Sequence, residues 1–519
     1  MHPVTALRAP RHPSTPPAGR LPGRRPLAAG RGLNLPASSA HFQPPPCSTV
    51  RASASAQPIK PGSAYPAGAT CSTCGLCDTP FIASVRDACA FLGDGMARLD
   101  ALEPALHGRS RDGRGGGQED QLGVIQAQFL GRMAPPPPGA ATQWSGIVTS
   151  LACAALEAGL VDGVACVASQ PDDPLCPRPI LARTAAEVRA AAGVKPSLSP
   201  SLELLPQVAD AVAAGTLSRL LFIGVGCQVQ ALRAVAGQLG LASLLVLGTN
   251  CTDNGWKKGL ETFLASSSAS PSTARHYEFH VDYRVHIVHA DPAAVPTERI
   301  PYFSLPASKL TDVIAPSCYS CFDYTNGGAD LVVGYMGAPY GGDGTPMRGS
   351  WQHVVVRNAR GAALVDALSA SAAGSALEVR PVVEAGSRTA LVRATVEADD
   401  AARRGEGPTS PMPIWLGTLI ARLLTMFGPR GIEFARYSVD YHVLRNFLYT
   451  RRHLARKGGA SSPPLPAGAR AIVEAYNADG WVDRLLAAPP GPGPGGPVVK
   501  GRGADGWWVG GGRAEGGEL

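Results

Sequence analysis

The feature that most constrains this chain is a run of three evenly spaced cysteines near its N-terminal end. Two residues separate Cys71 from Cys74 and Cys74 from Cys77, and Cys89 follows twelve residues later. This spacing places thiolates on one side of a tight loop, and an iron–sulfur cubane needs four such ligands. Structural zinc more often uses two separated cysteine pairs, so the run favours a cluster, with zinc as the alternative.

A second group of four cysteines is spread over a longer stretch. Cys227 follows a Gly-Val-Gly turn, Cys251 follows an apolar segment, and Cys318 and Cys321 form a C-x-x-C pair. A cysteine at a helix N-terminus has a lowered thiol pKa, which suits a metal ligand or a redox-active thiol. The C-x-x-C pair alone could be a redox disulfide. Taken together, the four predict a second cluster.

Hydrophobic periodicity in the middle of the chain predicts an α/β fold. Helical and strand patterns alternate along this region: Ser145–Leu160 (helix), Val161–Ala168 (strand), Leu220–Ile223 (strand), Gln228–Leu239 (helix) and Ser243–Leu247 (strand). This order argues for a parallel sheet. Cys227 and Cys251 then follow the carboxyl ends of strands, where open α/β sheets bind ligands. We expect an α/β (α+β) fold with a Rossmann-like parallel-sheet core, appended cluster-binding segments and a helical C-terminal region.

Four further segments have readable patterns. Residues 277–303 alternate as in a hairpin, and Leu331–Val333 forms a short strand that leads into a Gly-Tyr-Met-Gly turn. The apolar stretch Ile414–Phe427 is too short to span a membrane. It reads as a buried or an interfacial amphipathic helix, and of the two we expect burial. Phe434–Tyr449 reads as an aromatic helix packed in a core or between subunits.

The N-terminal end has the composition of an organelle transit peptide. Residues 1–70 contain seven arginines and Lys60 but no acid, and Arg, Ser, Pro and Ala dominate. We place cleavage near Ala52; a disordered basic tail is the alternative. Subtracting this +8 from the net charge of +7 leaves about −1, so the remainder gives no case for nucleic-acid binding.

Several long motifs occur in a fixed order: Cys71-Ser-Thr-Cys-Gly-Leu-Cys-Asp-Thr-Pro80, Asp87-Ala-Cys-Ala-Phe-Leu-Gly-Asp-Gly-Met96, Gly224-Val-Gly-Cys-Gln-Val-Gln-Ala-Leu232, Ala315-Pro-Ser-Cys-Tyr-Ser-Cys-Phe-Asp-Tyr324 and Ala329-Asp-Leu-Val-Val-Gly-Tyr-Met-Gly337. Together they resemble the family of deazaflavin-reducing hydrogenase beta subunits, and within it the hydroxymethyl chlorophyll reductases of plant and algal plastids. The match runs from about Cys71 to about residue 485. It departs at a Gly-rich insert near Gly115, at the Gly341–Gly344 loop and in the tail.

The resemblance implies a redox enzyme with FAD and two 4Fe–4S clusters, reduced ferredoxin as donor and a homotrimeric assembly. The reaction would convert the 7-hydroxymethyl group of chlorophyll a to methyl with loss of water, in the chlorophyll b to a conversion. The enzyme would work in the chloroplast stroma, with a peripheral thylakoid contact. The related 8-vinyl reduction of divinyl chlorophyllide is the alternative reaction. A non-catalytic iron–sulfur electron-transfer subunit is the alternative of another class.

The candidate site residues follow from the same reading. Helix starts and strand ends with small or hydroxyl residues could hold FAD, together with one lysine: Ser145, Gly146, Thr149, Lys195, Ser197, Gly226, Asn326, Gly334 and Gly337. Ser145 could equally be an ordinary helix cap. A departing hydroxyl needs a proton donor, for which Asp323, Tyr324 and His286 are candidates.

We divide the chain into seven segments: residues 1–52 (chloroplast transit peptide), 53–70 (linker), 71–134 (cysteine-rich iron–sulfur segment), 135–265 (α/β flavin-binding domain), 266–410 (hydrogenase-beta-like domain with the second cluster), 411–487 (helical region) and 488–519 (disordered Gly/Pro-rich tail).

Overall fold

A computed structural model describes residues 57–510, with gaps at 113–116, 139–141, 143, 307–308, 311, 340–348, 408–409, 455–463, 490–498 and 504–505. The expected transit peptide, the middle of the Gly-rich insert and the Gly341–Gly344 loop lie outside the described residues.

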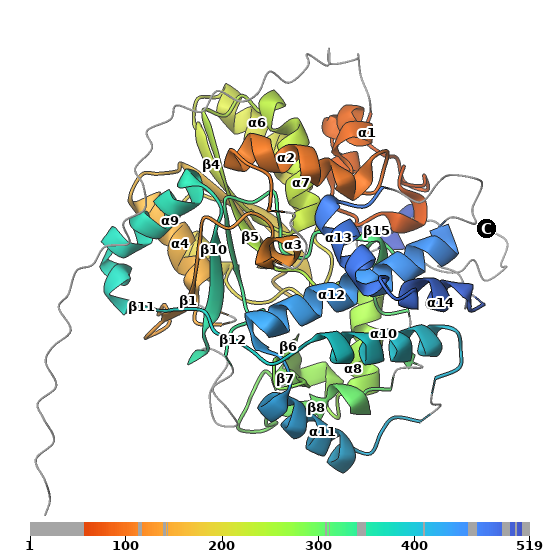
Figure 1. Cartoon of the computed structure of the whole chain (residues 1–519). Coiled ribbons are helices and arrows are strands. Elements are labelled where there is room, and N and C mark those ends of the chain that lie inside the picture. The colour runs from red at the N-terminus through yellow and green to blue at the C-terminus, as the bar shows by residue number, and fades with distance from the viewer. Residues whose placement is uncertain are drawn as a thin grey trace, which may run out of the picture. The chain divides into compact units, whose positions relative to one another are not determined.

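The centre of the fold is an eight-stranded sheet in the order β11-β1-β10-β9-β5-β4-β2-β3 (Figure 1). Its strands, in chain order, are β1 (Ala127–Met133), β2 (Gly163–Ser169), β3 (Pro177–Ala182), β4 (Arg219–Gly224), β5 (Ser243–Thr249), β9 (Leu331–Gly334), β10 (Gln352–Val356) and β11 (Leu377–Arg380). β2, β4, β5 and β9 pair in parallel, and the outer strands add antiparallel. The parallel core is therefore confirmed, and the sheet as a whole is mixed.

Helices cover the sheet because their apolar faces need a partner. α6 (Leu205–Ala213) and α7 (Gly226–Val235) share one buried cluster with residues of β4, β5 and β9. α4 (Ile147–Glu157) and α9 (Ala359–Ala370) pack against each other and against strands of the sheet. Residues of β4 that alternate with those in the first cluster, such as Leu221, are also buried, as a sheet covered on both faces requires.

The expected hairpin at residues 277–303 is a three-stranded antiparallel sheet. It contains β6 (Ala274–Phe279), β7 (Arg284–His289) and β8 (Glu298–Pro301), with Tyr283 at φ +60° in the turn between the first two. Its apolar face packs on α8 (Lys257–Ser267) around Phe263, Val285 and Ile287.

The aromatic helix is α12 (Ile432–Tyr449), and its packing role is confirmed. It lies beside α10 (Thr389–Arg403) and α13 (Ala467–Tyr476), and α14 (Trp481–Ala487) adds to the same buried cluster. The N-terminal α3 (Gln118–Leu122) also packs on α12, which ties both ends of the described chain together.

The expected burial of Ile414–Phe427 was wrong. This segment is a helix, α11, but only Gly417 and Ala421 are buried, while Trp415 is 69% and Phe427 is 76% exposed. α11 rests on β8 and on the turn after it through that narrow strip (Figure 1). Gly417 fits there so closely that a Cβ would stand 3.0 Å from Pro301 of β8 and collide with Ser304. Because α11 is buried only at these two small residues, most of its large apolar side chains stay exposed. Among the described helices, none combines the length and apolar character needed to cross a bilayer.

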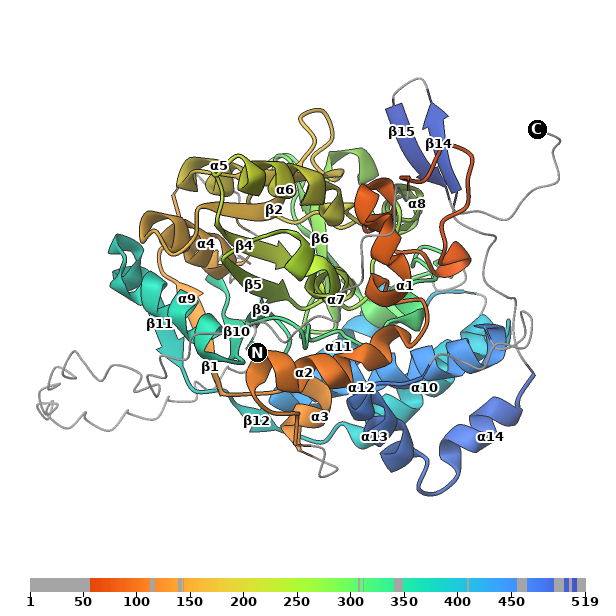
Figure 2. The ribbon, with the colours of Figure 1, turned by 90° about the horizontal axis from the view of Figure 1, so that it is seen from above.

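The tail expected to be disordered contains a hairpin. β14 (Val499–Gly503) pairs with β15 (Gly506–Gly510), and Ala64 in the linker bridges to Val499 (Figure 2). The Lys500 ammonium lies 2.6 Å from the Asp78 carboxylate. The expectation of disorder is therefore wrong for these strands, which pair with each other and contact the linker and Asp78.

A buried carboxylate connects the central strands to α9. Asp330, which is fully buried, accepts hydrogen bonds from the Val246 amide at 2.8 Å and from Asn358 at 2.8 Å. Arg233 and Arg360 lie 3.0 and 2.7 Å from its two oxygens. Burial raises the pKa of Asp330, but the two guanidinium groups outweigh it and hold the pKa at about 2.

Replacing Asp330 by Ala would leave two arginines without their shared carboxylate. We expect the free energy of unfolding, measured by urea at neutral pH, to fall by about 3–5 kcal/mol. The carboxylate is stabilising above its unfolded pKa of about 4, and its contribution is lost as the pH falls toward 2. The control is Asp366→Ala on the exposed face of α9, which should change stability by less than about 0.5 kcal/mol. Equal effects of the two changes would contradict this role.

Candidate iron–sulfur and flavin site

The first cysteine set lies in a tight loop of short turns. Thr73 and Gly75 adopt positive φ values of 49° and 91°, and the Thr73 amide lies 3.3 Å from the Cys71 sulfur. A Cβ on Gly75 would stand 2.7 Å from backbone atoms of Pro200 and Glu203, so the loop needs glycine there. Cys89 ends the short helix α1 (Val85–Ala88). The loop turns its thiols inward instead of toward solvent.

Electrostatics group these four thiols as the spacing predicts. Burial, followed by the charge of Cys74, raises the pKa of Cys71 well above its usual range, and Cys77 and Cys89 add to it. Burial likewise raises the pKa of Cys74 to about 12, with Cys89 contributing. Thiols in such surroundings ionise only if a cation compensates, and iron would do so.

The second set comes from three places in the chain. Cys227 is in the first turn of α7, Cys251 follows β5, and Cys318 and Cys321 flank a short turn. Burial raises the pKa of Cys227 most, and the charges of Cys321, Cys251, Cys318 and Cys74 add to it, in that order. The structure therefore brings the four expected residues together and places Cys74 of the first set near Cys227.

The sulfur spacing does not suit zinc. A tetrahedral zinc with bonds of about 2.3 Å holds its sulfurs about 4 Å apart. Within the described chain, the one group of at least three His, Cys, Asp or Glu ligand atoms all within 4.8 Å of one another is His280, Asp282 and His286. The eight cysteines, which form no disulfides, are spaced more widely than a single zinc ion requires. Thiolates are also the ligands that an iron–sulfur cluster needs.

Asn446, on α12, holds the second cysteine loop in place. Its amide Nδ2 lies 2.6 and 2.8 Å from the carbonyl oxygens of Cys318 and Cys321, and 2.5 Å from the Tyr324 hydroxyl. Tyr324 itself donates to the Cys321 carbonyl at 2.7 Å. Tyr324, which the sequence suggested as a proton donor in catalysis, is thus positioned to support the cysteine loop. The sequence reasoning missed Asn446, because one asparagine in an aromatic helix carries no motif.

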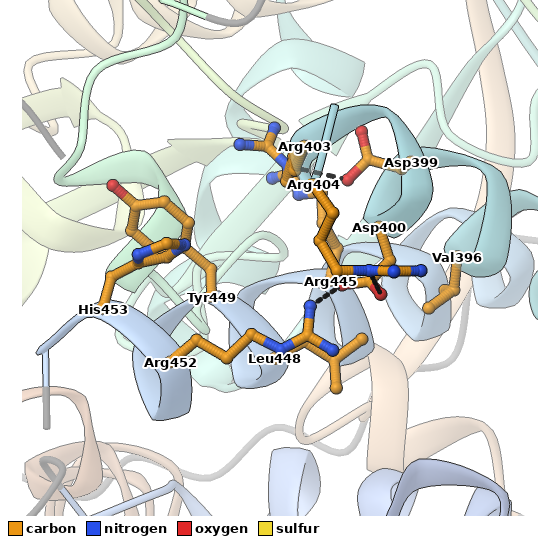
Figure 3. Close-up of a pocket in the computed structure, with 10 residues that line it drawn as sticks. All are labelled: Val396, Asp399, Asp400, Arg403, Arg404, Arg445, Leu448, Tyr449, Arg452 and His453. Atoms are coloured by element: carbon orange, nitrogen blue, oxygen red, sulfur yellow. Dashed lines mark hydrogen bonds and ion pairs between the residues drawn. The ribbon is translucent and has the colours of Figure 1, made fainter. Parts of the chain in front are cut away.

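A pocket is lined by residues from the C-terminal parts of α10 and α12 and from the turn after α12 (Figure 3), and two of its arginines contact Tyr319 of the second cysteine loop. Arg403 donates to the Tyr319 hydroxyl at 2.7 Å, and Arg445 stands 4.8 Å from the Tyr319 ring centre. Arg445 also binds Asp253 at 2.6 Å, next to Cys251. Asp399 and Asp400 form ion pairs with arginines of the pocket. We therefore interpret the pocket as a charged support of the cysteine loop.

Asp323, Gly226 and Asn326 close a packed turn. Asp323 accepts hydrogen bonds from the Gly327 amide at 2.7 Å and from Gln230 at 3.0 Å, and a Cβ on Gly226 would stand 2.6 Å from its Oδ2. Asn326, at φ +56°, donates to the Gly224 carbonyl at 2.8 Å. These contacts tie the turn to β4 and α7, and the three residues line no open cradle among the described atoms.

Ser145, Gly146 and Gly334 lie at the same edge of the sheet. Ser145 donates to Gln352 of β10 at 3.2 Å, and Gly146 starts α4 at φ +90°. Gly334 ends β9 where it pairs with β10, and a Cβ there would collide with Asn250. Trp144 stacks on Tyr335 with ring centres 5.0 Å apart and planes within 12°. This edge combines a helix start, close backbone approach and aromatic faces.

The remaining candidates are placed elsewhere. Lys195 donates to the carbonyls of Ala191 and Gly193, and burial lowers its pKa to about 8. Ser197 donates to the Leu175 carbonyl at 3.3 Å, and Thr149 is buried within α4. Gly337, at φ +78°, packs against the start of α12.

His286 is on β7, where its Nε2 lies 2.9 Å from the Asp282 carboxylate.

Comparison with known proteins supports one family. Residues 129–206 match the N-terminal profile, and residues 217–383 the C-terminal profile, of the coenzyme F420 hydrogenase/dehydrogenase beta subunit. A chloroplastic 7-hydroxymethyl chlorophyll a reductase of Oryza sativa subsp. japonica is 51% identical over 82% of this chain and 87% of its own length. An uncharacterised Nostoc protein is 42% identical over 81% and 97%.

More distant matches cover less of the chain. The coenzyme F420 hydrogenase beta subunit of Methanosarcina barkeri is 27% identical over 47% of this chain and 77% of its own. A chain of the solved F420-reducing [NiFe] hydrogenase complex from that organism is 22% identical, with a TM-score of 0.43 and coverage of 57% and 97%. On the strength of the sequence relatives, this chain belongs to the coenzyme F420 hydrogenase/dehydrogenase beta-subunit family.

Proposed function

We propose that this protein is a chloroplast oxidoreductase that reduces 7-hydroxymethyl chlorophyll a to chlorophyll a with electrons from ferredoxin. The observation that carries the proposal is the presence of two four-cysteine sets, close enough that the charge of Cys74 adds to the rise in the Cys227 pKa. The 51% identity to the rice reductase, over most of both chains, supports the choice of pigment.

The chemistry needs both single-electron and two-electron carriers. Ferredoxin delivers electrons singly, whereas replacing a hydroxyl by hydrogen takes two electrons and two protons. The eight cysteines would hold two 4Fe–4S clusters that pass single electrons. FAD, when bound, would store both electrons. The residues that fit a flavin are Ser145, Gly146 and Gly334 at the sheet edge, with the Trp144–Tyr335 stack beside them.

The cluster assignment predicts a divided loss of iron. Anaerobically reconstituted protein should hold about eight irons per chain. Cys74→Ala and Cys318→Ala should each lower this count by about four, because each change removes a ligand from a different set. Cys176→Ala, outside both sets, should keep the full count. Iron analysis and the visible absorption spectrum measure the result. Loss of all iron in a variant that keeps its circular dichroism spectrum would contradict the division into two sets.

The proposed reaction is tested with reduced ferredoxin and the pigment. Anaerobic protein loaded with iron and FAD should convert 7-hydroxymethyl chlorophyll a to chlorophyll a, and pigment chromatography measures the product. Without ferredoxin, no chlorophyll a should form. Cys318→Ala should lower the rate by at least about 100-fold, because it interrupts the electron path. Fully loaded protein that forms no chlorophyll a would contradict the proposed function.

The same assay with divinyl chlorophyllide as the pigment tests the alternative reaction, in which the protein would reduce the 8-vinyl group of that pigment instead. A non-catalytic electron-transfer subunit would instead turn over neither pigment. A homotrimer, which the family resemblance suggests, should appear by light scattering as about three times the mass of one chain. The exposed apolar face of α11 is available for contacts with other molecules, including the thylakoid surface.

A further inference from the structure

A cluster of four buried ionisable side chains lies on the β6–β7 hairpin, on a different structural element from the cysteines. Glu278 is on β6, His280 and Asp282 are in the turn, and His286 is on β7; each is at most 4% exposed. His280 Nε2 lies 3.8 Å from Glu278 Oε2, and the His280 ring stacks on the His286 ring with centres 4.1 Å apart. His286 Nε2 in turn lies 2.9 Å from the Asp282 carboxylate, so each of the four side chains has another member of the cluster as its neighbour.

The cluster reaches the sheet edge through Trp144. The Trp144 indole donates to Glu278 Oε1 at 3.1 Å, and its ring lies 4.9 Å from His280 and 5.0 Å from Tyr335. Tyr335 follows β9 directly, and the charge of Glu278 adds to burial in raising the Tyr335 pKa. Glu278 is therefore next to the edge that carries Ser145, Gly146 and Gly334.

Glu278 has the properties of a neutral acid. Burial raises its pKa well above the usual range for a carboxyl, and only the Trp144 hydrogen bond opposes this. No described residue forms a hydrogen bond with Oε2, and the neighbouring His280 is also neutral because burial and His286 lower its pKa to about 3. Asp282, Arg299 and His276 also act on His280. A neutral carboxyl with one oxygen not engaged can donate a proton at that atom.

We propose that Glu278 donates the proton that leaves with the pigment hydroxyl as water, and that His280, backed by His286 and Asp282, returns it. This inference rests on the proposed function. The C–O bond of the hydroxymethyl group breaks, and its oxygen takes the Glu278 proton to leave as water. Two electrons, supplied by two reduced ferredoxins, and a second proton form the new C–H bond. Glu278 is left as carboxylate and is reprotonated by a proton from water. The neutral His280 ring relays that proton: it releases the proton on Nε2, which lies 3.8 Å from Glu278 Oε2, while Nδ1 takes up another.

The test is Glu278→Gln, which keeps the side-chain volume and an acceptor oxygen for Trp144 but has no acidic proton. We expect kcat for pigment reduction to fall by at least about 100-fold. Pigment affinity, from quenching of pigment fluorescence, and the rate of flavin bleaching by reduced ferredoxin should change less than about threefold, because binding and electron delivery do not need the proton. His280→Gln should slow kcat by at least about tenfold, since reprotonation is impaired.

A second measurement requires no turnover. In pigment-free protein at neutral pH, the infrared spectrum should contain a C=O band of a protonated carboxylic acid that shifts in D2O and is missing in Glu278→Gln. The matched control, Glu298→Gln, changes a carboxylate on the neighbouring β8 that pairs with His289 and Ser268, and should keep both the band and kcat.

The outcomes separate the two proposals. Wild-type protein that leaves the pigment unchanged would defeat the proposed function, whatever the infrared result. Active wild-type protein, together with a Glu278→Gln variant whose kcat is within threefold of it, would overturn Glu278 as the donor. Absence of the Glu278 band at neutral pH would overturn it as well, because an ionised carboxylate has no proton to give.

Discussion

The gathering of eight buried or half-buried cysteines at one end of the sheet is the constraint on which the rest of the structure depends. Burial and neighbouring thiol charges oppose ionisation of Cys71 and Cys227 alike. Bringing such groups together costs free energy unless a cation compensates, and bound iron would supply that compensation. Residues of the N-terminal loop, α7, the end of β5 and the 318–321 turn would then be held by shared ligands as well as by packing.

The protein adds polar supports around the second set that packing alone would not provide. Asn446 fixes two carbonyls of the cysteine turn, and Arg445 binds Asp253 beside Cys251. Both supports come from α12, so this helix belongs to the cysteine site as much as to the C-terminal core. The aromatic residues of α12 bury it firmly enough to make Asn446 a fixed anchor.

Local spacing explains what the sequence could predict. The first cysteine set and the parallel strands β4 and β5 were predicted from short-range patterns, and the strands pair as expected. The second set was predicted from the places of its members at strand ends and in a C-x-x-C pair, and its role as a set of ligands stays a prediction. The antiparallel pairing of β1 with β10 joins residues more than 200 positions apart, which periodicity cannot reveal. The exposure of α11 was mispredicted because an apolar stretch does not specify its partner. Asn446 and Glu278 escaped notice because their importance comes from their neighbours in space.

If the proposed function holds, the routes of electrons and protons are separate. The cysteine sets approach the sheet edge through Cys251, which follows β5, while the acidic groups approach through Glu278 on a separate hairpin. Trp144 and Tyr335 stand between them. A buried carboxyl stays protonated only if no strong positive charge lies near it, whereas the cysteine loops are surrounded by arginines such as Arg403 and Arg445. Placing the two kinds of site on different structural elements lets each keep the electrostatic environment that its chemistry requires.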